Sequence, residues 1–250
     1  MRVFATLVRR ELGGFFFSLT GYVIIAGVLL LLGVSFVALL ESCNGGTVAG
    51  PLTEMFYSTM YFWLILLVAT PVMTMRLFAL EKFSGTFETL MTTPVRDLEV
   101  VLAKFLGALM FYVVTWLPLL ACLHVVRRYT GPPAGFDWWP VGSTFLGILL
   151  LGCLYVAMGC FASALTRSQI IAAMVSLALG LSLFVLSFLR FSLNASAGWA
   201  AQALTYLSII DHMEDFTRGV VDTRHVTFYL TFTVLFLFLT LKAVESRRWK

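Results

Sequence analysis

The sequence predicts an all-α membrane protein with six transmembrane helices and with the N-terminus and the C-terminus both in the cytoplasm. Composition is the first reason: the 250 residues are 60% hydrophobic and 12% charged, and the mean hydropathy of +0.94 lies outside the range of soluble globular proteins. The charges also gather in short clusters between long apolar runs, and the cations are divided unevenly between the two sides of the membrane. We therefore interpret residues 1–250 as a single transmembrane domain.

Six apolar runs are long enough to cross the hydrocarbon core, which takes roughly 20 helical residues. They lie at about residues 20–40, 57–76, 103–126, 141–165, 168–189 and 226–244. The first run is too long for a cleaved signal peptide and no small-residue cleavage site follows it, so we expect it to be a span. The four cysteines have no metal-binding spacing and are interpreted as small apolar residues.

The distribution of cations sets the expected orientation. With the N-terminus in the cytoplasm, twelve of the 17 Lys and Arg residues fall on the cytoplasmic side: Arg2, Arg9, Arg10, Arg76, Lys82, Arg96, Lys104, Arg167, Lys242, Arg247, Arg248 and Lys250. The opposite side receives Arg127, Arg128, Arg190, Arg218 and Arg224. This bias is typical of an N-in, C-in protein. Because the cations flank membrane helices and form no stripe, they do not indicate nucleic-acid binding.

Residues 1–18 are expected to form an amphipathic helix that precedes the first span. Its apolar residues fall near one helical face: Val3, Phe4, Leu7, Val8 and Leu12. Its charged residues occupy the other face: Arg2, Arg9, Arg10 and Glu11. The pattern is typical of a helix in the membrane interface, in contact with lipids. The alternative is an ordinary basic anchor that fixes topology, and both interpretations place the segment on the cytoplasmic surface.

Residues 77–102 form the long polar interruption on the cytoplasmic side, between the second and third spans. Arg76 and Glu81–Lys82 mark the point where the second span leaves the membrane. Gly85 is expected to break the helix, because glycine readily adopts a left-handed conformation. Thr86 can then cap the next helix through its side-chain oxygen.

The helix that follows Thr86 is expected to be short and rigid. Glu88 lies in its first turn, where the helix dipole favours a carboxylate, and Leu90 lies on its apolar face. Pro94 suits the first position of the next helix, which continues into the third span. A short helix held between two spans can transmit a push from a soluble partner.

Residues 190–225 form the largest expected outer segment. Helical periodicity between residues 198 and 218 predicts one or two short helices resting on the outer membrane surface. Five residues suggest a metal site there: Asp211, His212, Glu214, Asp215 and His225. A solvated helix face explains them better than a metal, because the sequence shows no convergent set of ligands with supporting groups.

Several energy sources and reactions have no signature in the chain. The expected spans contain no Asp or Glu in their interiors, which argues against a proton- or sodium-driven carrier. The chain has no GxxxxGK[ST] phosphate loop, HExxH motif or GxSxG motif, so it is not expected to be an enzyme or to carry a cofactor.

The segment Glu81–Val95 reads Glu-Lys-x-x-Gly-Thr-x-Glu-x-Leu-x-x-x-Pro-Val and resembles the signature of type-2 ABC transporter permeases. The stretch from Arg10-Glu11 to Gly21-Tyr22 resembles the interfacial helix of that family. Residues 216–224 and 245–249 are similar to its gliding-motility subfamily, so the resemblance covers nearly the whole chain. The sequence departs from the usual pattern at Leu80, where the family more often has an acidic residue, and at Phe83, where it has a basic or polar one.

This resemblance implies the partners and the site. It implies an ATP-binding cassette ATPase subunit that docks on the cytoplasmic coupling helix, and a second permease copy or paralogue that completes a dimer. The coupling positions that it implies are Glu81, Lys82, Gly85, Thr86, Glu88, Leu90 and Pro94. The interfacial helix contributes Arg9, Arg10 and Glu11.

The expected function is that of a multi-pass permease subunit in a bacterial cytoplasmic (inner) membrane, which couples ATP hydrolysis by a separate subunit to export or extrusion. The alternative is a force-transmitting or scaffold subunit of the gliding-motility type, which moves no solute and acts on an extracytoplasmic partner protein through residues 190–225. A neighbouring gene for a protein with a large extracytoplasmic domain would favour the alternative.

Overall fold

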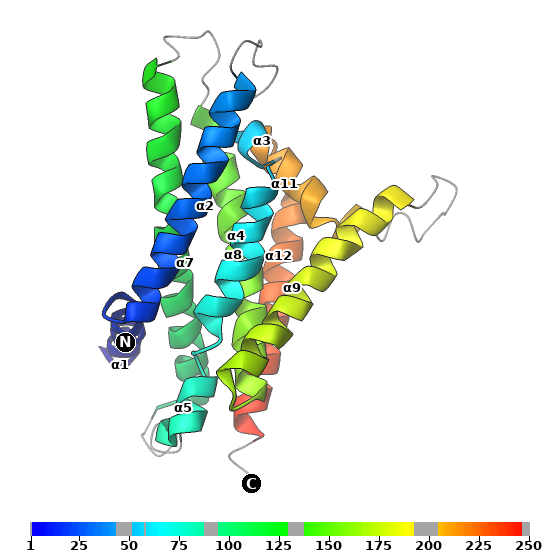
Figure 1. Cartoon of the computed structure of the whole chain (residues 1–250). Coiled ribbons are helices and arrows are strands. Elements are labelled where there is room, and N and C mark those ends of the chain that lie inside the picture. Colours follow the sequence, from blue (N-terminus) through cyan, green and yellow to red (C-terminus); the bar gives the residue numbers. More distant parts are fainter. Residues whose placement is uncertain are drawn as a thin grey trace.

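The computed structural model describes residues 2–43, 52–57, 59–87, 95–129, 138–192 and 205–246, and every regular element within them is a helix (Figure 1). Six stretches are long and apolar enough to cross a membrane: Leu19–Glu41, Met60–Ser84, Asp97–Val125, Trp138–Leu165, Gln169–Phe188 and Thr223–Glu245. The predicted all-α membrane fold with six spans is therefore confirmed. The described parts of the two termini lie at the same end of the bundle, as an even number of spans requires (Figure 1).

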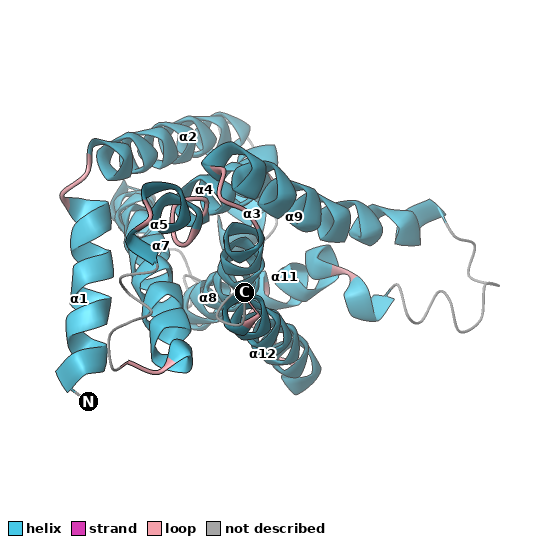
Figure 2. Ribbon diagram, turned by 90° about the horizontal axis from the view of Figure 1, so that it is seen from below, coloured by secondary structure: helices cyan, strands magenta, loops and turns pink. Residues whose placement is uncertain are grey.

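The first helix, α1 (Arg2–Phe16), lies across the bundle axis, because it is seen end-on in Figure 1 and lengthwise in Figure 2. A tight turn at Phe17 and Ser18 connects it to the first span, α2 (Leu19–Cys43). The Ser18 hydroxyl stabilises this turn by donating to the Phe15 carbonyl oxygen at 3.0 Å and accepting from the Gly21 amide at 3.2 Å. The predicted interfacial position of α1 agrees with this orientation.

The second and third spans enclose the segment of greatest functional interest. The second span begins with α4 (Met60–Thr74), passes through a turn at residues 75–78 and continues as the short α5 (Ala79–Ser84). The third span is α7 (Asp97–Tyr129). In Figure 1, α5 lies at the same end of the bundle as α1 and the C-terminus.

The fourth span, α8 (Trp138–Leu165), is the centre of the bundle and packs against α4, α7, α9 (Gln169–Ser192) and α12 (Thr223–Glu245). Glycines on α8 allow these close approaches: a Cβ atom at Gly152 would overlap the Tyr112 ring of α7, and one at Gly159 would overlap Thr74 of α4. On α9, Gly180 accepts a hydrogen bond from the Tyr155 hydroxyl at 3.1 Å. Small residues at these positions thus allow the helix backbones to approach each other closely.

The opposite end of the bundle is closed by α3 (Leu52–Tyr57) and α11 (Ile209–Thr217). The predicted outer helix is present as α11, and its apolar face packs on protein, because Ile209, Met213 and Phe216 are fully buried against other helices. The Tyr57 hydroxyl donates to the Ile210 carbonyl oxygen at 2.6 Å. An amphipathic pattern identifies the buried face of such a helix but not whether lipid or protein covers it.

Candidate functional site: a charged junction at the end of the second span

The short helix α5 ends where the sequence predicts a break. Its C-terminal cap is Gly85, with φ of 74° in the left-handed region, which glycine adopts without a Cβ clash. The Thr86 hydroxyl forms a hydrogen bond with the Ser84 hydroxyl at 2.8 Å. Of the other predicted coupling positions, Glu88, Leu90 and Pro94 lie outside the described residues. The structure thus gives the base of the coupling segment and its attachment to the spans.

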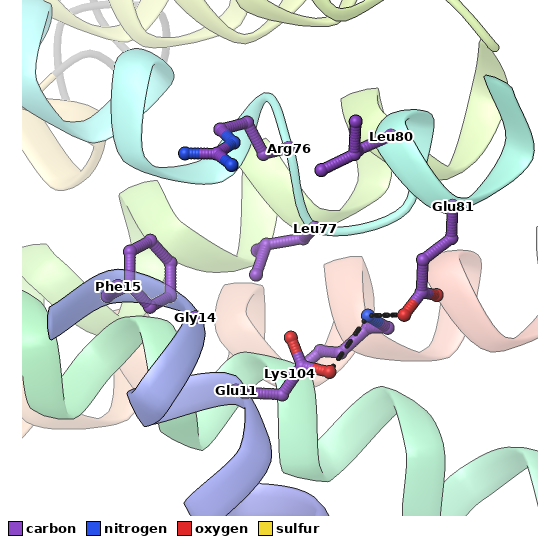
Figure 3. Close-up of a pocket in the computed structure, with 8 residues that line it drawn as sticks. All are labelled: Glu11, Gly14, Phe15, Arg76, Leu77, Leu80, Glu81 and Lys104. Carbon is purple, nitrogen blue, oxygen red and sulfur yellow. Dashed lines mark hydrogen bonds and ion pairs between the residues drawn. The ribbon is translucent and has the colours of Figure 1, made fainter. Parts of the chain in front are cut away.

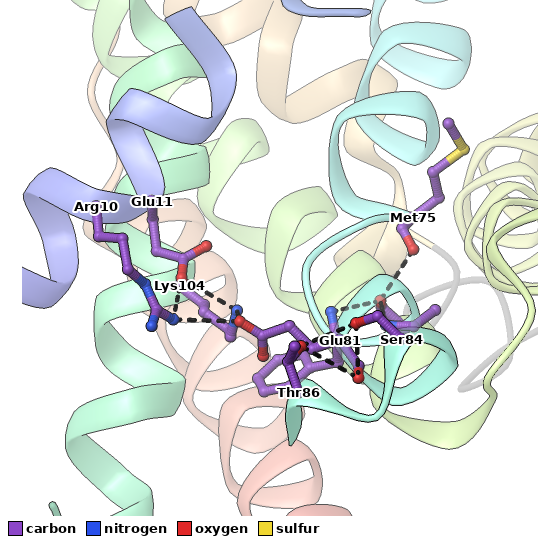
Figure 4. A network of polar contacts seen from close by, with 10 residues as sticks. Arg10, Glu11, Met75, Glu81, Ser84, Thr86 and Lys104 are labelled. Atoms are coloured by element: carbon purple, nitrogen blue, oxygen red, sulfur yellow. Dashed lines mark hydrogen bonds and ion pairs between the residues drawn. The ribbon is translucent and has the colours of Figure 1, made fainter. Parts of the chain in front are cut away.

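That attachment is a group of four ionic side chains from three helices, which we call the charged junction: Arg10 and Glu11 of α1, Glu81 of α5 and Lys104 of α7. The Lys104 Nζ lies 2.9 Å from Glu81 Oε1 and 3.1 Å from Glu11 Oε1. An Arg10 guanidinium nitrogen lies 3.2 Å from Glu81 Oε1 and 3.1 Å from Glu11 Oε1. Figure 4 shows the two cations alternating with the two carboxylates, so that the formal charges balance.

Lys104 is the centre of the charged junction, because only 2% of its side chain is exposed. The two carboxylates are also largely covered, with side-chain exposures of 14% for Glu11 and 19% for Glu81. Isolated buried charges are costly, and a buried ammonium is tolerated when opposite charges and hydrogen bonds surround it. The Phe78 ring adds a cation–π contact, with its centroid 5.3 Å from Lys104 Nζ. Three segments distant in sequence therefore meet at one ammonium group.

The packing of α1 on α7 brings Glu11 to Lys104. Phe15 stacks on Phe111 with ring centroids 4.7 Å apart, and a Cβ atom at Gly107 would lie 2.8 Å from Glu11 Cβ. The absence of a side chain at Gly107 therefore permits the close approach. Glu11 was predicted to share the charged face of α1 with Arg9 and Arg10, which are exposed, but its carboxylate turns towards Lys104 of α7.

A cavity of about 110 Å³ lies beside the charged junction, between α1, α7 and the turn that follows α4. Arg76 and Leu77 line it on one side, and Glu11 and Lys104 line it on the other (Figure 3). Arg76 donates to the Thr20 hydroxyl of α2, so the turn after α4 also contacts the start of the first span. One oxygen of Glu81, Oε2, is buried without a hydrogen-bond partner.

A second attachment ties α5 to the central helix α8. The Ser163 hydroxyl accepts hydrogen bonds from the amides of Phe78 and Ala79, each at 3.0 Å, and donates to the Met75 carbonyl oxygen at 3.1 Å. Lys82 is buried and donates to the Ala164 carbonyl oxygen. Ser163 thus caps amides at the start of α5 that have no partner within their own helix.

Lys104 and Ser163 were not predicted as site residues. For Lys104 the sequence does carry a signal, because it lies just inside an apolar run where an ionisable residue is expected to have a partner. Ser163 carries none, since serine is common at close helix contacts in membranes.

At the end of the bundle opposite the termini lie Asp211, His212, Glu214, Asp215 and His225, for which the sequence offered two interpretations, a metal site and a solvated helix face. The structure agrees fully with neither. Among the described residues, no group of three or more His, Cys, Asp or Glu side chains converges to hold a metal ion. A solvated helix face is also wrong for His212, which is only 2% exposed and stacks on His225 with ring centroids 4.0 Å apart. Hydrophobic periodicity did not reveal this, because histidine was counted as a polar residue.

The comparisons with known proteins agree with the architecture. A search of curated proteins finds no match. The family model described as ABC-2 family transporter protein matches residues 46–242, which is more than half of the chain and covers four of the six spans in full and the last one up to residue 242. The matched region also contains Glu81 and Lys104 of the charged junction. With six apolar helices and this match over most of its length, the chain belongs to the ABC-2 transporter family, as a multi-pass, non-catalytic permease subunit of an ABC transporter.

Proposed function

We propose that this permease subunit lies in a bacterial cytoplasmic membrane with both termini inside, and couples ATP hydrolysis by a separate ATPase subunit to export or extrusion. The observation that carries the proposal is the double attachment of α5: the charged junction ties it to α1 and α7, and Ser163 ties it to α8. The helix α5 lies at the same end of the bundle as the N- and C-termini marked in Figure 1. Among the described side chains this end also carries most of the cations, namely Arg9, Arg10, Arg76, Lys82, Arg96, Lys104, Arg167 and Lys242, as the positive-inside rule expects of a cytoplasmic face.

The contacts suggest how a push on the coupling segment reaches the spans. A displacement of α5 moves Glu81, whose Oε1 atom holds both Lys104 and Arg10. Because Lys104 belongs to α7 and Arg10 to α1, both helices are pulled together with α5. Separating the ions without replacing their partners would leave buried charges uncompensated, which costs about 3–5 kcal/mol for a buried pair. Rigid movement of the three helices is therefore cheaper than stretching the contact.

The partners in this proposal are an ATP-binding cassette ATPase subunit and a second permease copy or paralogue. The ATPase subunit would dock on the segment 81–95 through the helix that carries Glu88, because Glu81 at the base of the segment is engaged by Arg10 and Lys104. The second permease would pair through the membrane-facing surfaces of the bundle. The gliding-motility resemblance supports a second candidate, a force-transmitting subunit that moves no solute and acts on an extracytoplasmic partner.

The experiment separates docking from transmission. Glu88→Lys reverses the charge on the docking helix, so the ATPase subunit should copurify poorly while membrane insertion stays normal. Glu81→Gln removes the charge that holds Lys104 and Arg10, so the ATPase subunit should still copurify while its stimulated turnover and substrate efflux from proteoliposomes fall. The control is Glu245→Lys, a charge reversal at the C-terminal end of α12 and outside the charged junction.

Three results decide the proposal. Normal association and turnover in Glu88→Lys would contradict the docking site, and normal stimulated turnover and efflux in Glu81→Gln would contradict transmission through the charged junction. ATPase stimulation without efflux of any amphiphile tested would favour the force-transmitting function.

A further inference from the structure

The end of the bundle opposite the termini contains a histidine pair that the coupling function does not use. His212 of α11 stacks on His225 of α12, with ring centroids 4.0 Å apart and ring planes inclined at 32°. His225 Nε2 lies 2.9 Å from a carboxylate oxygen of Asp215. His212 Nδ1 is buried and has no hydrogen-bond partner. One histidine of the pair therefore has a carboxylate partner, and the other is enclosed without one.

Aromatic side chains enclose His212 on the α12 side. Phe228 and Tyr229 both contact its ring edge-to-face, with centroid distances of 5.2 Å and 5.7 Å. Such a pocket accepts a neutral imidazole and disfavours an imidazolium, because a charge loses its hydration there. A second positive charge on His225 at this distance would add repulsion. The closed cluster thus holds His212 as a neutral imidazole and disfavours the addition of a second proton to its ring.

The helix that carries His212 is held by a small number of hydrogen bonds to other elements. Thr53 and Ser143 donate to the carbonyl oxygens of Thr217 and Phe216, at 3.0 Å and 2.6 Å. The Ile209 amide donates to the Ser187 hydroxyl of α9 at 3.0 Å. These contacts join the two ends of α11 to α3, α8 and α9, and with Tyr57 they define the seated position of the helix. Because His225, Phe228 and Tyr229 of α12 cover the His212 ring, separation of α11 from α12 would expose that ring to water.

The charged groups around the pair are already engaged elsewhere. Arg218 contacts Glu54 of α3 at 3.0 Å and Glu214 at 2.6 Å, and these carboxylates raise the Arg218 pKa. Asp222 accepts a hydrogen bond from the Arg224 amide at 2.8 Å. Among described side chains, α9 has no ionisable group and those of α8 begin at Cys153, deep in the span. The remaining titratable groups on the elements around α11 are Tyr57 of α3, Asp211 of α11 itself, and Arg224, Tyr229, Lys242 and Glu245 of α12, the last two near its far end.

We propose that His212, His225 and Asp215 form a proton-operated latch, which holds α11 against α12 while His212 is neutral and releases it when the adjoining compartment is acidified. In the orientation proposed above, that compartment is extracytoplasmic. The ligand of the latch is the proton, and the element that moves in response is α11 rather than the coupling segment at residues 81–95. The latch does not depend on the identity of the ATPase subunit or of the substrate.

The direction of the pH response follows from the pKa of His212. Burial, then the neighbouring His225, lowers it from 6.5 to about 3, and Asp222 opposes this shift only in part. A released His212 regains an ordinary pKa near 6.5, so the released form binds a proton that the seated form refuses. The seated form is then fully favoured above about pH 6.5 and loses stability as the pH falls from there towards 3. Between these limits, release becomes about tenfold more favourable for each pH unit.

Hydrogen exchange of the α11 amides tests the latch in the full chain in lipid nanodiscs. The quantity is the protection factor, the ratio of intrinsic to observed exchange rate, which removes the direct effect of pH on exchange. For the wild type we expect it to fall about 30-fold between pH 7.5 and pH 5.0, as uptake of one proton with a released-state pKa near 6.5 requires. In His212→Phe, which keeps an aromatic ring but cannot be protonated, the protection factor should be constant over this range.

Two further variants protect the test against misfolding and unrelated titration. His212→Gln is a second neutral replacement, and it too should abolish the pH dependence of the protection factor. The test therefore needs only one of the two His212 variants to retain the fold. His124→Gln removes the third histidine of the chain, on α7, and should keep the full 30-fold change. A wild-type protection factor that is constant from pH 7.5 to 5.0 would overturn the proposal. So would an undiminished change in a folded His212 variant.

Discussion

Replacing Lys104 with methionine tests whether the charged junction holds the three helices together. Methionine keeps the length and apolar stem of the lysine but removes the ammonium, which is 2.9 Å and 3.1 Å from two carboxylate oxygens. Removing one partner of a buried pair costs about 3–5 kcal/mol, and the partial exposure of Glu11 and Glu81 places this site at the lower end, about 3 kcal/mol. At about 2–4 °C per kcal/mol for a chain of this size, the Tm should fall by about 6–12 °C.

The assay is thermal unfolding of the purified chain in detergent, with Lys242→Met as the matched control. Lys242 also pairs with a glutamate, Glu245 at 2.7 Å, but its side chain is 57% exposed. An exposed pair contributes at most about 1 kcal/mol, so the control should unfold close to the wild type. Adding Glu81→Gln to Lys104→Met should recover part of the loss, because one stranded carboxylate is removed. Equal Tm values for Lys104→Met and Lys242→Met would refute the central position of Lys104, as would strictly additive losses in the double variant.

Two further predictions concern the packing around α8. Gly159→Leu should prevent α4 from packing at Thr74 and so reduce the yield of monodisperse protein in size-exclusion chromatography. The control is Gly142→Leu on the same helix, which should behave like the wild type because no atom lies within 4 Å of its Cβ position. Equal yields of the two variants would contradict the packing argument. Ser163→Ala should leave the buried amides of Phe78 and Ala79 unpaired, at a cost of about 1–3 kcal/mol of stability per amide, measured as a lower Tm. The control is Ser182→Ala, at an exposed serine of α9. An equal fall in Tm for the two variants would show that Ser163 does not anchor α5.

The six spans and the amphipathic helix that precedes them could be predicted from the sequence because hydropathy and amphipathicity depend on residues close together in the chain. The end of α5 at Gly85 was predictable for the same reason, since a left-handed glycine is a local feature. The partners of Lys104 were not predictable in this way. Glu11 is 93 residues from it, and their contact depends on how α1 packs against α7.

The outer end shows the same limit. Periodicity predicted a helix near Ile209–Thr217 but could not show that α3, α8 and α9 cover it. The same lack of tertiary information hid His212, because an imidazole suits both a wet and an enclosed position. Of the predicted coupling positions, the structure describes Glu81, Lys82, Gly85 and Thr86. The coupling role of all seven positions stays a prediction.

The contact between Glu11 and Lys104 also constrains the order of biogenesis. The ribosome delivers Glu11 long before Lys104, which is 93 residues later in the chain. Until the third span has been inserted, Glu11 lacks the ammonium that it meets in the finished protein and stays hydrated at the membrane surface. The helix α1 therefore reaches its final seat after α7, although it is translated earlier than α7.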